Sequence, residues 1–592
     1  MTRALFPISL RSAFAAPFFL LAASVAAQEL RVSPQNEDLA ERLRAEALVL
    51  SSEGDATPGD IIATAKGDYG RLLAVLYEEG YFGASVSITL GGREVSGLTP
   101  FGISETGAVA IAVDLGQRFT FGRASVAPLP PGAELPEGFA IGETAGTAVI
   151  QTAARSAVSD WRAASHAKAE VSGQSITARH SVSELDVALA IDPGPALRFG
   201  RLILPPDNTI RGKRILQVAG LPGGQPFNPD DLRRVRNRLV STGTFNSVVL
   251  REAELPNADG TLDIELGLEA APPRRLGFGA EIESTNGLSL EAFWLHRNIF
   301  NGAERLRFDA GIEGIGGTSG GMDYTLGVTL SIPGFRRADD TLSLFATLER
   351  RDEESFTEDL FEFGVRGERQ LTDGLVIGNE IGLRFSESTD SFGTRTFEHL
   401  ILSIDGELDR RDDPLNPSGG LYSFVDIKPF IGIGGSETGV RLEGDLRGYR
   451  SVGESTVIAG RAQIGSVFMT SIEDTPPDFL FFSGGGGTVR GQGFQSLAID
   501  GAGGTTGGRS FAGLSLELRQ SISESIGLVG FFDVGYIGES SDLQGGGDHS
   551  GAGLGLRYIT PLGPLRVDVG VPVGGSSDGS DYGLYIGLGQ AF

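Results

Sequence analysis

The hydrophobic and polar residues of this chain follow different patterns in its two halves. In residues 28–273, segments with a helical period alternate with short strand-like segments. One example is the predicted helix Tyr69–Glu79. Its residues Leu72, Val75 and Leu76 share one face, because positions three and four apart lie together on a helix. We therefore expect an α+β first half.

The second half, from residue 274 to residue 592, loses the helical period. Segments of about ten residues alternate apolar positions with polar or glycine positions, and turn residues separate them. In the segment 565–571, the apolar residues share one face of a strand, and Arg566 and Asp568 share the other. At roughly twenty residues per strand and connection, this half predicts about sixteen antiparallel strands. Both a soluble sandwich and a transmembrane β-barrel fit the alternation.

The N-terminal residues favour the barrel, because they predict export from the cytoplasm. Arg3 and Arg11 precede the apolar stretch 13–27, which ends in Val25-Ala26-Ala27. Charge, apolar stretch and small residues in this order are typical of a secretory signal peptide, predicted here as residues 1–27. A membrane anchor is the alternative, although the apolar stretch is short for one.

A repeated segment divides the first half. Val113–Arg123 matches Ile191–Arg201 at Asp, Gly, Phe-Gly-Arg and the apolar positions, and Ile264–Gly267 is a third, weaker copy. A period of roughly 75 residues indicates tandem small domains. The predicted boundaries are 28–116, 117–195 and 196–273 for three α+β repeats, followed by a barrel domain at 274–592.

Composition and charge exclude several classes of function. A net charge of −27 does not suit a nucleic-acid partner, and the absence of cysteine excludes a disulfide-stapled fold. The five histidines lack the spacing of metal ligands. Neither a phosphate-binding P-loop nor a G-x-S-x-G nucleophile elbow occurs. We therefore expect no enzyme activity, no cofactor and no metal.

A glycine-rich stretch in the second half contains the candidate functional residues. The segment Phe481–Ser496 holds a single arginine, Arg490, between glycines. A flexible surface loop is one interpretation. If residues 477–508 instead fold into the lumen of a barrel, Arg490 requires a carboxylate partner, because an unpaired charge is costly there.

Val489-Arg490-Gly491 resembles the inward-folded loop of the BamA/TamA superfamily of outer-membrane assembly barrels. The family places an aromatic residue directly after the Arg-Gly pair. This chain has Gln492 there, and Phe494 follows two positions later. The departure leaves the role of the family's first aromatic residue open in this chain.

Three further motifs resemble the same superfamily. The turn motif D-x-R-D-x-P-x-x-P-x-x-G matches at Asp409, Arg411, Asp412, Pro414, Pro417 and Gly420. The strand motif F-x-D-x-G matches at Phe531, Asp533 and Gly535, and the segment 563–570 resembles the penultimate-strand motif. A tight connection between strands explains the turn motif equally well, because proline cannot join a ladder.

The resemblance implies how the loop is held. Arg490 is expected to meet Asp533 on the barrel wall, because a guanidinium offers a rigid fork to a carboxylate. The alternative is that Asp533 pairs with Arg557 or Arg566. The loop glycines are expected to let the backbone approach the wall closely.

The resemblance also implies a lateral seam between the first strand, about 276–282, and the last strand, 582–592. The last strand alternates and ends on an aromatic residue, like the ending by which outer-membrane barrels are recognised. Glycine weakens strand pairing. The expected seam residues are Gly583, Gly587, Gly589 and Phe592.

The three repeats look like POTRA domains, which the resemblance places in the periplasm beneath an outer-membrane barrel. BamA-like proteins usually carry five such domains, two-partner secretion transporters two, and TamA three. The implied function is TamA-like assembly of β-barrel and autotransporter clients, with unfolded outer-membrane proteins, the lipid bilayer and a TamB-like inner-membrane-anchored protein as partners. A BamA-like general factor, a two-partner secretion pore and a simple porin are the alternatives, and spacer domains without binding are the alternative for the repeats.

Overall fold

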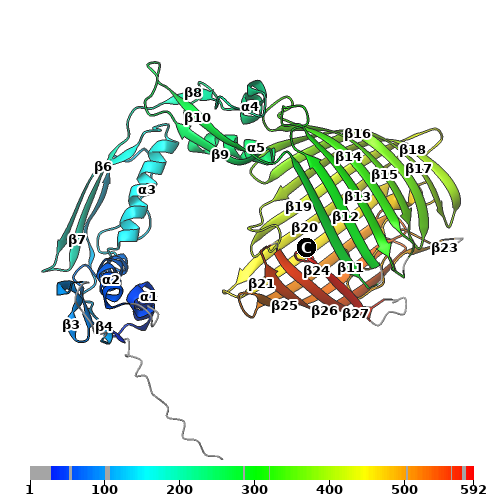
Figure 1. Cartoon of the computed structure of the whole chain (residues 1–592). Helices are drawn as coiled ribbons and strands as arrows, with labels where there is room; N and C mark the ends of the chain where they lie inside the picture. The colour runs from blue at the N-terminus through cyan, green and yellow to red at the C-terminus, as the bar shows by residue number, and fades with distance from the viewer. Residues whose placement is uncertain are drawn as a thin grey trace, which may run out of the picture. The chain divides into compact units, whose positions relative to one another are not determined.

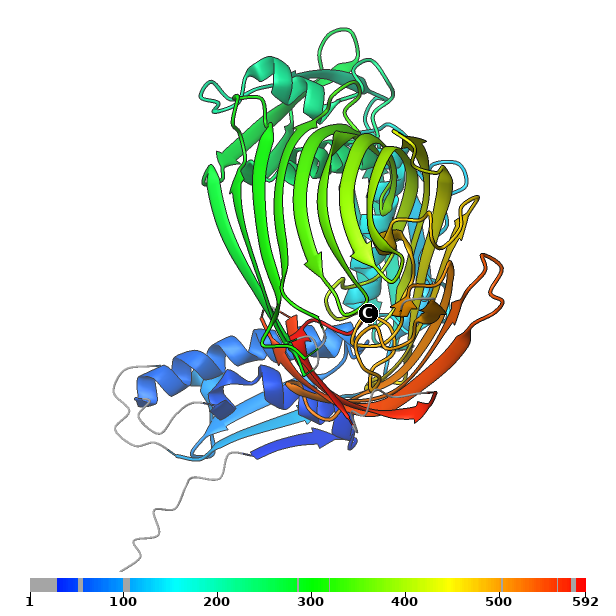
Figure 2. The ribbon, with the colours of Figure 1, turned by 90° about the vertical axis from the view of Figure 1, so that its right-hand side faces the viewer.

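The computed structural model describes residues 29–51, 57–99, 107–284, 287–318, 320–501, 504–561, 563–575 and 582–592. The predicted signal peptide at residues 1–27 lies outside these ranges. The chain forms two compact units, Met1–Arg198 with Pro226–Pro229 and Phe199–Gln225 with Asp230–Phe592. The first unit holds two sheets with helices, and the second holds a third sheet and a barrel (Figures 1 and 2).

The first sheet has the strand order β1-β4-β2-β3 and packs against α1 and α2. Its elements are β1 Glu29–Ser33, α1 Glu37–Glu46, η1 Leu48–Ser51, α2 Pro58–Glu78, β2 Ser85–Leu90, β3 Arg93–Glu94, η2 Val95–Gly97 and β4 Val109–Asp114. The sequence predicts only the second half of α2, from Tyr69. The helix begins earlier because Thr57 and Asp60 form a capping box at its start. Ile62 then continues the buried face that contains Leu72.

The second sheet has the order β5-β7-β6, and α3 lies along it (Figure 1). Its elements are β5 Thr120–Ala127, α3 Thr147–Ala163, β6 Glu170–Arg179 and β7 Glu184–Asp192. β6 is antiparallel to β7 and forms an edge of the sheet. Among the described residues, the outer side of β6 has no strand partner.

The third sheet has the order β8-β10-β9. Its elements are β8 Arg198–Ile203, α4 Gly212–Ala219, α5 Pro229–Ser241, β9 Phe245–Glu252 and β10 Thr261–Ala270. Pro229 is the first residue of α5, where its missing N–H removes no helical hydrogen bond. Val235 and Leu239 form the buried face of this helix. The three sheets with their helices resemble POTRA domains.

In the described part of the chain, sixteen strands close into an antiparallel barrel in chain order (Figure 2). They are β11 Arg274–Glu283, β12 Gly287–His296, β13 Arg305–Ile315, β14 Asp323–Pro333, β15 Asp340–Asp352, β16 Phe356–Thr372, β17 Leu375–Asp390, β18 Gly393–Asp409, β19 Gly420–Ile433, β20 Gly439–Val452, β21 Thr456–Phe468, β24 Ser510–Ser521, β25 Ile526–Gly538, β26 Gly547–Thr560, β27 Gly563–Gly574 and β28 Gly583–Leu588. The predicted fold class, α+β repeats followed by a barrel of about sixteen strands, is confirmed.

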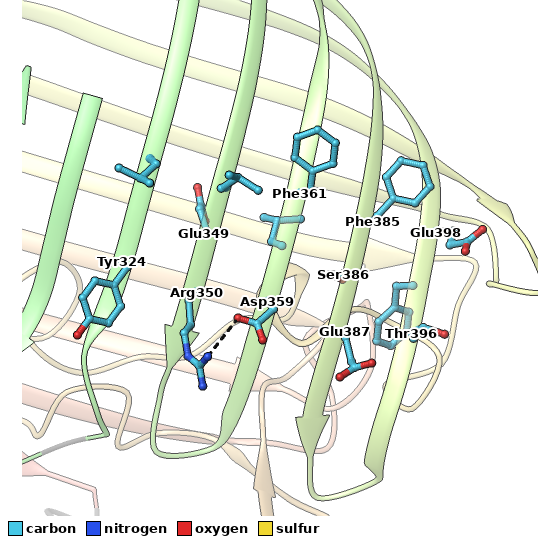
Figure 3. Close-up of a pocket in the computed structure, with 14 residues that line it drawn as sticks. Tyr324, Glu349, Arg350, Asp359, Phe361, Phe385, Ser386, Glu387, Thr396 and Glu398 are labelled. Atoms are coloured by element: carbon cyan, nitrogen blue, oxygen red, sulfur yellow. Dashed lines mark ion pairs between the residues drawn. The ribbon is translucent and has the colours of Figure 1, made fainter. Parts of the chain in front are cut away.

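The outer wall of the barrel is an apolar band with a polar border. On β14 to β17, one row of paired, exposed positions consists of Leu326, Leu348, Phe361 and Phe385. The neighbouring row, nearer the β15–β16 turn, consists of Tyr324, Arg350, Asp359, Glu387 and, on β18, Thr396. Arg350 and Asp359 face each other in this row at 3.8 Å (Figure 3). An apolar band that ends in a polar row suits the hydrocarbon and headgroup layers of a bilayer.

Within the second unit, the third sheet's helices hold the rim of the barrel. Arg214 of α4 donates from Nη2 to the carbonyl oxygen of Pro333 at 2.6 Å. Arg238 of α5 forms a two-pronged ion pair with Asp339, with distances of 2.5 and 2.9 Å. The short connection 271–273 joins β10 to β11 at the same end.

Candidate lumenal anchor and strand seam

The segment between β21 and β24, residues 469–509, enters the barrel lumen, where its residues 478–492 contact the inner wall; we call it the inward-folded segment. It contains η3, Pro477–Phe479, and a small hairpin of β22, Ile499–Gly501, and β23, Gly504–Thr506. Its two arms are joined by paired backbone hydrogen bonds between Phe481 and Gly508, both 2.8 Å. Arg490, near the tip, is only 2% exposed.

Arg490 forms ion pairs with three carboxylates of the barrel wall. Its Nε and Nη2 donate to Oδ2 and Oδ1 of Asp533 on β25, at 2.8 and 3.0 Å. Its Nη1 donates to Oε1 of Glu517 on β24 at 2.7 Å and to Oδ2 of Asp568 on β27 at 3.4 Å. The four side chains are 0–3% exposed. The contacts use the planar fork of a guanidinium, which lysine lacks.

Two wall arginines complete the charge cluster. Arg519 donates from Nε to Oε2 of Glu517 at 2.8 Å, and Arg557 pairs with Asp568. Three guanidinium groups therefore face three carboxylates. One of the three positive charges comes from the loop, so the wall is neutral only while Arg490 is in place.

Asp533 has Arg490 as its side-chain partner in the part of the chain that the structure describes. The alternative partners considered from the sequence, Arg557 and Arg566, bind other carboxylates. The structure therefore brings together the loop arginine and the aspartate of the F-x-D-x-G strand.

The wall on either side of Asp533 is shaped to the loop. The guanidinium of Arg490 lies 3.7 Å from the ring centre of Phe531. Gly535 leaves space for the loop, because a Cβ there would lie 2.9 Å from a methyl of Val489. Ring, carboxylate and gap stand at alternate positions of one strand face. The strand motif thus presents three complementary surfaces to the loop tip.

Gly491 connects the loop tip to the last strand. Its φ is +97°, and a Cβ at this position would lie 2.6 Å from the carbonyl oxygen of Val571. Glycine suits this position because it adopts a positive φ without strain and has no Cβ to collide with the Val571 oxygen. Its N–H donates to the hydroxyl of Tyr585 on β28 at 2.9 Å. The anchor and the last strand are therefore in direct contact.

Gln492 occupies the position where the related loops have an aromatic residue. Its side-chain amide donates to the carbonyl oxygens of Ser550 on β26 and Gly574 on β27, at 2.8 and 2.9 Å. Phe494 is half-buried next to Gly485. In this chain, the residue after the Arg-Gly pair therefore binds the backbone of the wall.

β11 and β28 meet along a short seam. Their paired positions among the described residues are Ile282 with Ile586 and Glu283 with Tyr585. The segment 274–281 of β11 pairs with β12 on its other side, but has no ladder partner on the seam side among the described residues. The seam thus leaves most of the β11 edge without backbone pairing.

One ion pair spans the seam on its inner face. Arg566 of β27 donates to Oε1 of Glu281 on β11 at 2.6 Å. Gly587 of β28 lies beside this pair, since a Cβ there would lie 3.1–3.2 Å from the two side chains. Gly583, at the start of β28, lies on the same face, where a Cβ would lie 2.5 Å from the Tyr585 hydroxyl.

The structure places Phe592 in the lumen rather than in the seam, so the predicted last strand to residue 592 is too long. β28 ends at Leu588, and the chain turns inward at Gly589, where φ is +92°. The end of the chain is marked C in Figures 1 and 2. The ring of Phe592 lies 6.5 Å from that of Tyr449. Its backbone oxygen accepts a hydrogen bond from Arg519 at 3.1 Å. The N–H of Gly589 still donates to the carbonyl oxygen of Pro564 on β27 at 2.7 Å, and lumenal partners then hold Gln590 and Phe592.

The turn motif connects β18 to β19 and is held by its own polar groups. Arg411 binds Asp409 through Nε and Nη2, at 2.9 and 2.7 Å. Asp412 accepts hydrogen bonds from the N–H and the hydroxyl of Ser418. Partial burial acts to raise the pKa of Asp412, but these hydrogen bonds outweigh it and lower the pKa to about 2. These contacts lie within the turn itself, as expected for a tight connection between two strands.

The remaining residues of the turn motif face different neighbours. The carbonyl oxygen of Pro414 accepts from Arg411 at 3.2 Å, and that of Pro417 accepts from Arg519 at 3.4 Å. Gly420 begins β19 with a φ of +102°. The contact through Pro417 joins the turn to the charge cluster around Arg490.

Sequence reasoning did not identify Glu517, Asp568 or Tyr585 as partners of the loop tip. The alternation of the segments 512–519 and 565–571 does place their charged residues on the polar face. It does not indicate which of them meets the loop. Tyr585 carries no such signal, because an aromatic residue fits either face of a barrel strand.

Two other features, a metal site and a membrane-spanning helix, are absent from the described residues. They contain no group of three or more His, Asp or Glu side chains placed to hold a metal ion. No helix within the described ranges has the length and apolar character needed to cross a bilayer.

Comparison with known proteins identifies the barrel. The family model of the Omp85 superfamily domain matches residues 298–592. The chain is similar to the solved structure of BamA from Haemophilus ducreyi lacking POTRA domains 1–3, with 14% identity, a TM-score of 0.60, and coverage of 79% of this chain and 100% of that one. It also matches CdiB from Acinetobacter baumannii, with 11% identity, a TM-score of 0.49, and coverage of 79% and 90%. Residues 298–592 of this chain therefore match the Omp85 superfamily domain, and the barrel has a BamA-like fold.

Proposed function

We propose that this chain is a TamA-like assembly factor, which inserts or translocates β-barrel and autotransporter clients through the β11–β28 seam. The observation that carries the proposal is the short pairing of these two strands. The unpaired edge of β11 offers backbone donors and acceptors to an extended client strand, which gains hydrogen bonds by joining it. The proposal involves no catalysis.

The strength of backbone pairing favours opening at this seam over any neighbouring pair. β25 and β26, for example, are paired over the whole of Ile526–Ile537. A hydrogen bond contributes about 1 kcal/mol net. Freeing the described seam therefore costs a few kcal/mol, whereas separating β25 from β26 costs on the order of ten. A client strand that replaces the seam bonds offsets most of the smaller cost.

The segment inside the lumen supports assembly over open conduction. The inward-folded segment and residues 589–592 occupy the interior of the barrel. A simple porin keeps a water-filled channel instead. This arrangement favours a role at the seam over diffusion through the lumen.

The sheets of the first half supply the second part of the proposal, an arm in the periplasm. β6 is a long edge strand with most of its side chains exposed. Such an edge accepts an additional strand from another chain. Unfolded clients and a TamB-like inner-membrane-anchored protein are the proposed partners of this arm.

A disulfide across the seam tests the proposal, and the chain suits this test because it has no native cysteine. Ile282→Cys with Ile586→Cys joins a paired position of the seam. We expect the oxidised double variant, in lipid vesicles, to stop inserting a urea-denatured outer-membrane barrel protein, and a reductant to restore insertion. The control is Leu528→Cys with Leu556→Cys, a paired position of β25 and β26. Wild-type insertion with the seam locked would contradict the proposal.

Depletion in the native organism distinguishes the TamA-like role from its alternatives. Loss of a subset of outer-membrane proteins is expected. Loss of most barrels with lethality would favour a BamA-like general factor, and loss of one exported protein would favour a two-partner secretion pore. Each outcome is read from the protein content of isolated outer membranes.

A further inference from the structure

The inward-folded segment carries a second buried charge, and it has the opposite sign to Arg490. Asp478, in η3, binds Nη2 of Arg384 on β17 through Oδ1 at 2.7 Å. Its Oδ2 lies 3.1 Å from Nη1 of Arg351 on β15. The side chains of Asp478 and Arg384 are 7% and 1% exposed. Here the segment supplies the carboxylate and the wall supplies the arginines.

The residue next to Asp478 reinforces this contact. The ring of Phe479 lies 4.7 Å from the guanidinium of Arg384 and packs edge-on against Phe430 with 5.1 Å between ring centres. The backbone oxygen of Phe479 accepts a hydrogen bond from Nε of Arg441 at 3.1 Å. The ion pair of Asp478, the ring of Phe479 and the backbone oxygen of Phe479 thus hold the same turn of the segment.

The two charged contacts lie on opposite arcs of the barrel. Asp478 binds side chains from β15 and β17, and Arg490 binds side chains from β24, β25 and β27. In the closed order of sixteen strands, β16 stands opposite β26. The segment between residues 478 and 490 therefore spans the lumen from one arc to the other.

Arg384 and Arg351 each have a carboxylate partner on the barrel wall besides Asp478. Arg384 also binds Oε1 of Glu358 at 3.0 Å, and Arg351 also binds Oε2 of Glu349 at 2.5 Å. Without the segment, these two wall arginines therefore still face two wall carboxylates. Removing the charge of Asp478 therefore leaves a balanced wall, in contrast to the removal of Arg490.

We infer that Asp478 is a positioning residue, a second anchor that makes the segment a brace across the lumen. With Arg490 held on the far arc, the brace sets the place of Gly491, whose N–H binds Tyr585 beside the seam. The effect of the brace on client insertion rests on the proposed function. The anchoring itself does not.

Hydrogen–deuterium exchange of the full chain in lipid vesicles tests the anchor with Asp478→Asn. We expect exchange in residues 470–485 to rise roughly tenfold or more, because a buried charge-assisted bond is lost. Exchange in β25 and β26 should stay at the wild-type level. Asp478→Glu, which keeps the carboxylate, should restore protection. The matched control is Asp474→Asn, in the same segment, where the aspartate bonds to exposed Ser471.

Three outcomes would overturn the anchor. They are unchanged exchange in residues 470–485, an equal rise in the Asp474→Asn control, and a simultaneous rise in β25 and β26 that marks general unfolding. Arg351→Gln provides a second approach, because it withdraws one partner but leaves Arg384 in place. It should raise exchange by a smaller factor than Asp478→Asn, and an unchanged value would count against the anchor.

Client insertion by the same variants separates the anchor from the proposed function. A released segment with slower insertion supports both. A released segment with wild-type insertion supports the anchor and overturns its role in assembly. The exchange measurement needs no client, so failure of the proposed function leaves the anchor independently tested.

Discussion

Removal of Arg490 should destabilise the barrel through the charges it leaves behind. In Arg490→Ala, three buried carboxylates face two arginines, and Asp533 loses its side-chain partner. Breaking a buried ion pair by removing one partner costs about 3–5 kcal/mol. We therefore expect the free energy of unfolding to fall by that amount.

The same charge balance predicts a rescue. Asp533→Asn in the Arg490→Ala background leaves two arginines and two carboxylates, the pairs Arg519–Glu517 and Arg557–Asp568. The double variant should therefore lose less stability than the sum of the two single variants. Neighbours in one ion network couple by up to about 3 kcal/mol, and we expect about 2 kcal/mol here.

Denaturant unfolding in lipid vesicles measures this cycle. The chain has two tryptophans, so Trp161→Phe leaves Trp294 of β12 as the reporter of the barrel. Arg350→Ala is the control, because its exposed pair with Asp359 should be worth less than about 1 kcal/mol. Wild-type stability of Arg490→Ala, or strictly additive effects in the double variant, would refute the reasoning.

Three further changes test other contacts. Gly491→Ala should lower barrel stability by about 2 kcal/mol or more, measured by the same unfolding assay, because of its positive φ and a backbone oxygen 2.6 Å from the new Cβ. Gly487→Ala, in open space on the same segment, should change little. Because the pKa of Asp412 falls from 3.8 to about 2 on folding, its carboxylate stabilises the turn above about pH 4 and loses this effect as the pH falls through 2. Asp412→Asn should abolish this pH dependence, followed by hydrogen exchange of residues 409–420. Arg238→Ala should increase proteolysis of the turn 334–339 by breaking the two-pronged pair with Asp339, and unchanged cleavage would contradict that role.

The sequence by itself determined the alternating strands of the second half, because strand alternation is a local property. The polar residues of segments such as 565–571 share one face of their strand by parity alone, whichever strands become neighbours, and the closure into a barrel makes that face the lumenal one. The buried face of α2 from Tyr69 onward is local in the same way, since it depends on residues three and four apart. The contact of Arg490 with Asp533 was expected only from the resemblance of their motifs to the superfamily, and the residues alone left Arg557 and Arg566 as alternative partners.

Only the tertiary structure decided which lumenal charges meet the inward-folded segment. Parity assigns Glu517 and Asp568 to the inner face but not to Arg490, because their meeting depends on the path of a long segment across the lumen. The same holds for Asp478 and Arg384, which are far apart in sequence. The inward turn after Leu588 was hidden for a related reason. Residues 589–592 alternate like a strand, but partners from other strands hold Gln590 and Phe592 in the lumen, and such long-range contacts override a local pattern.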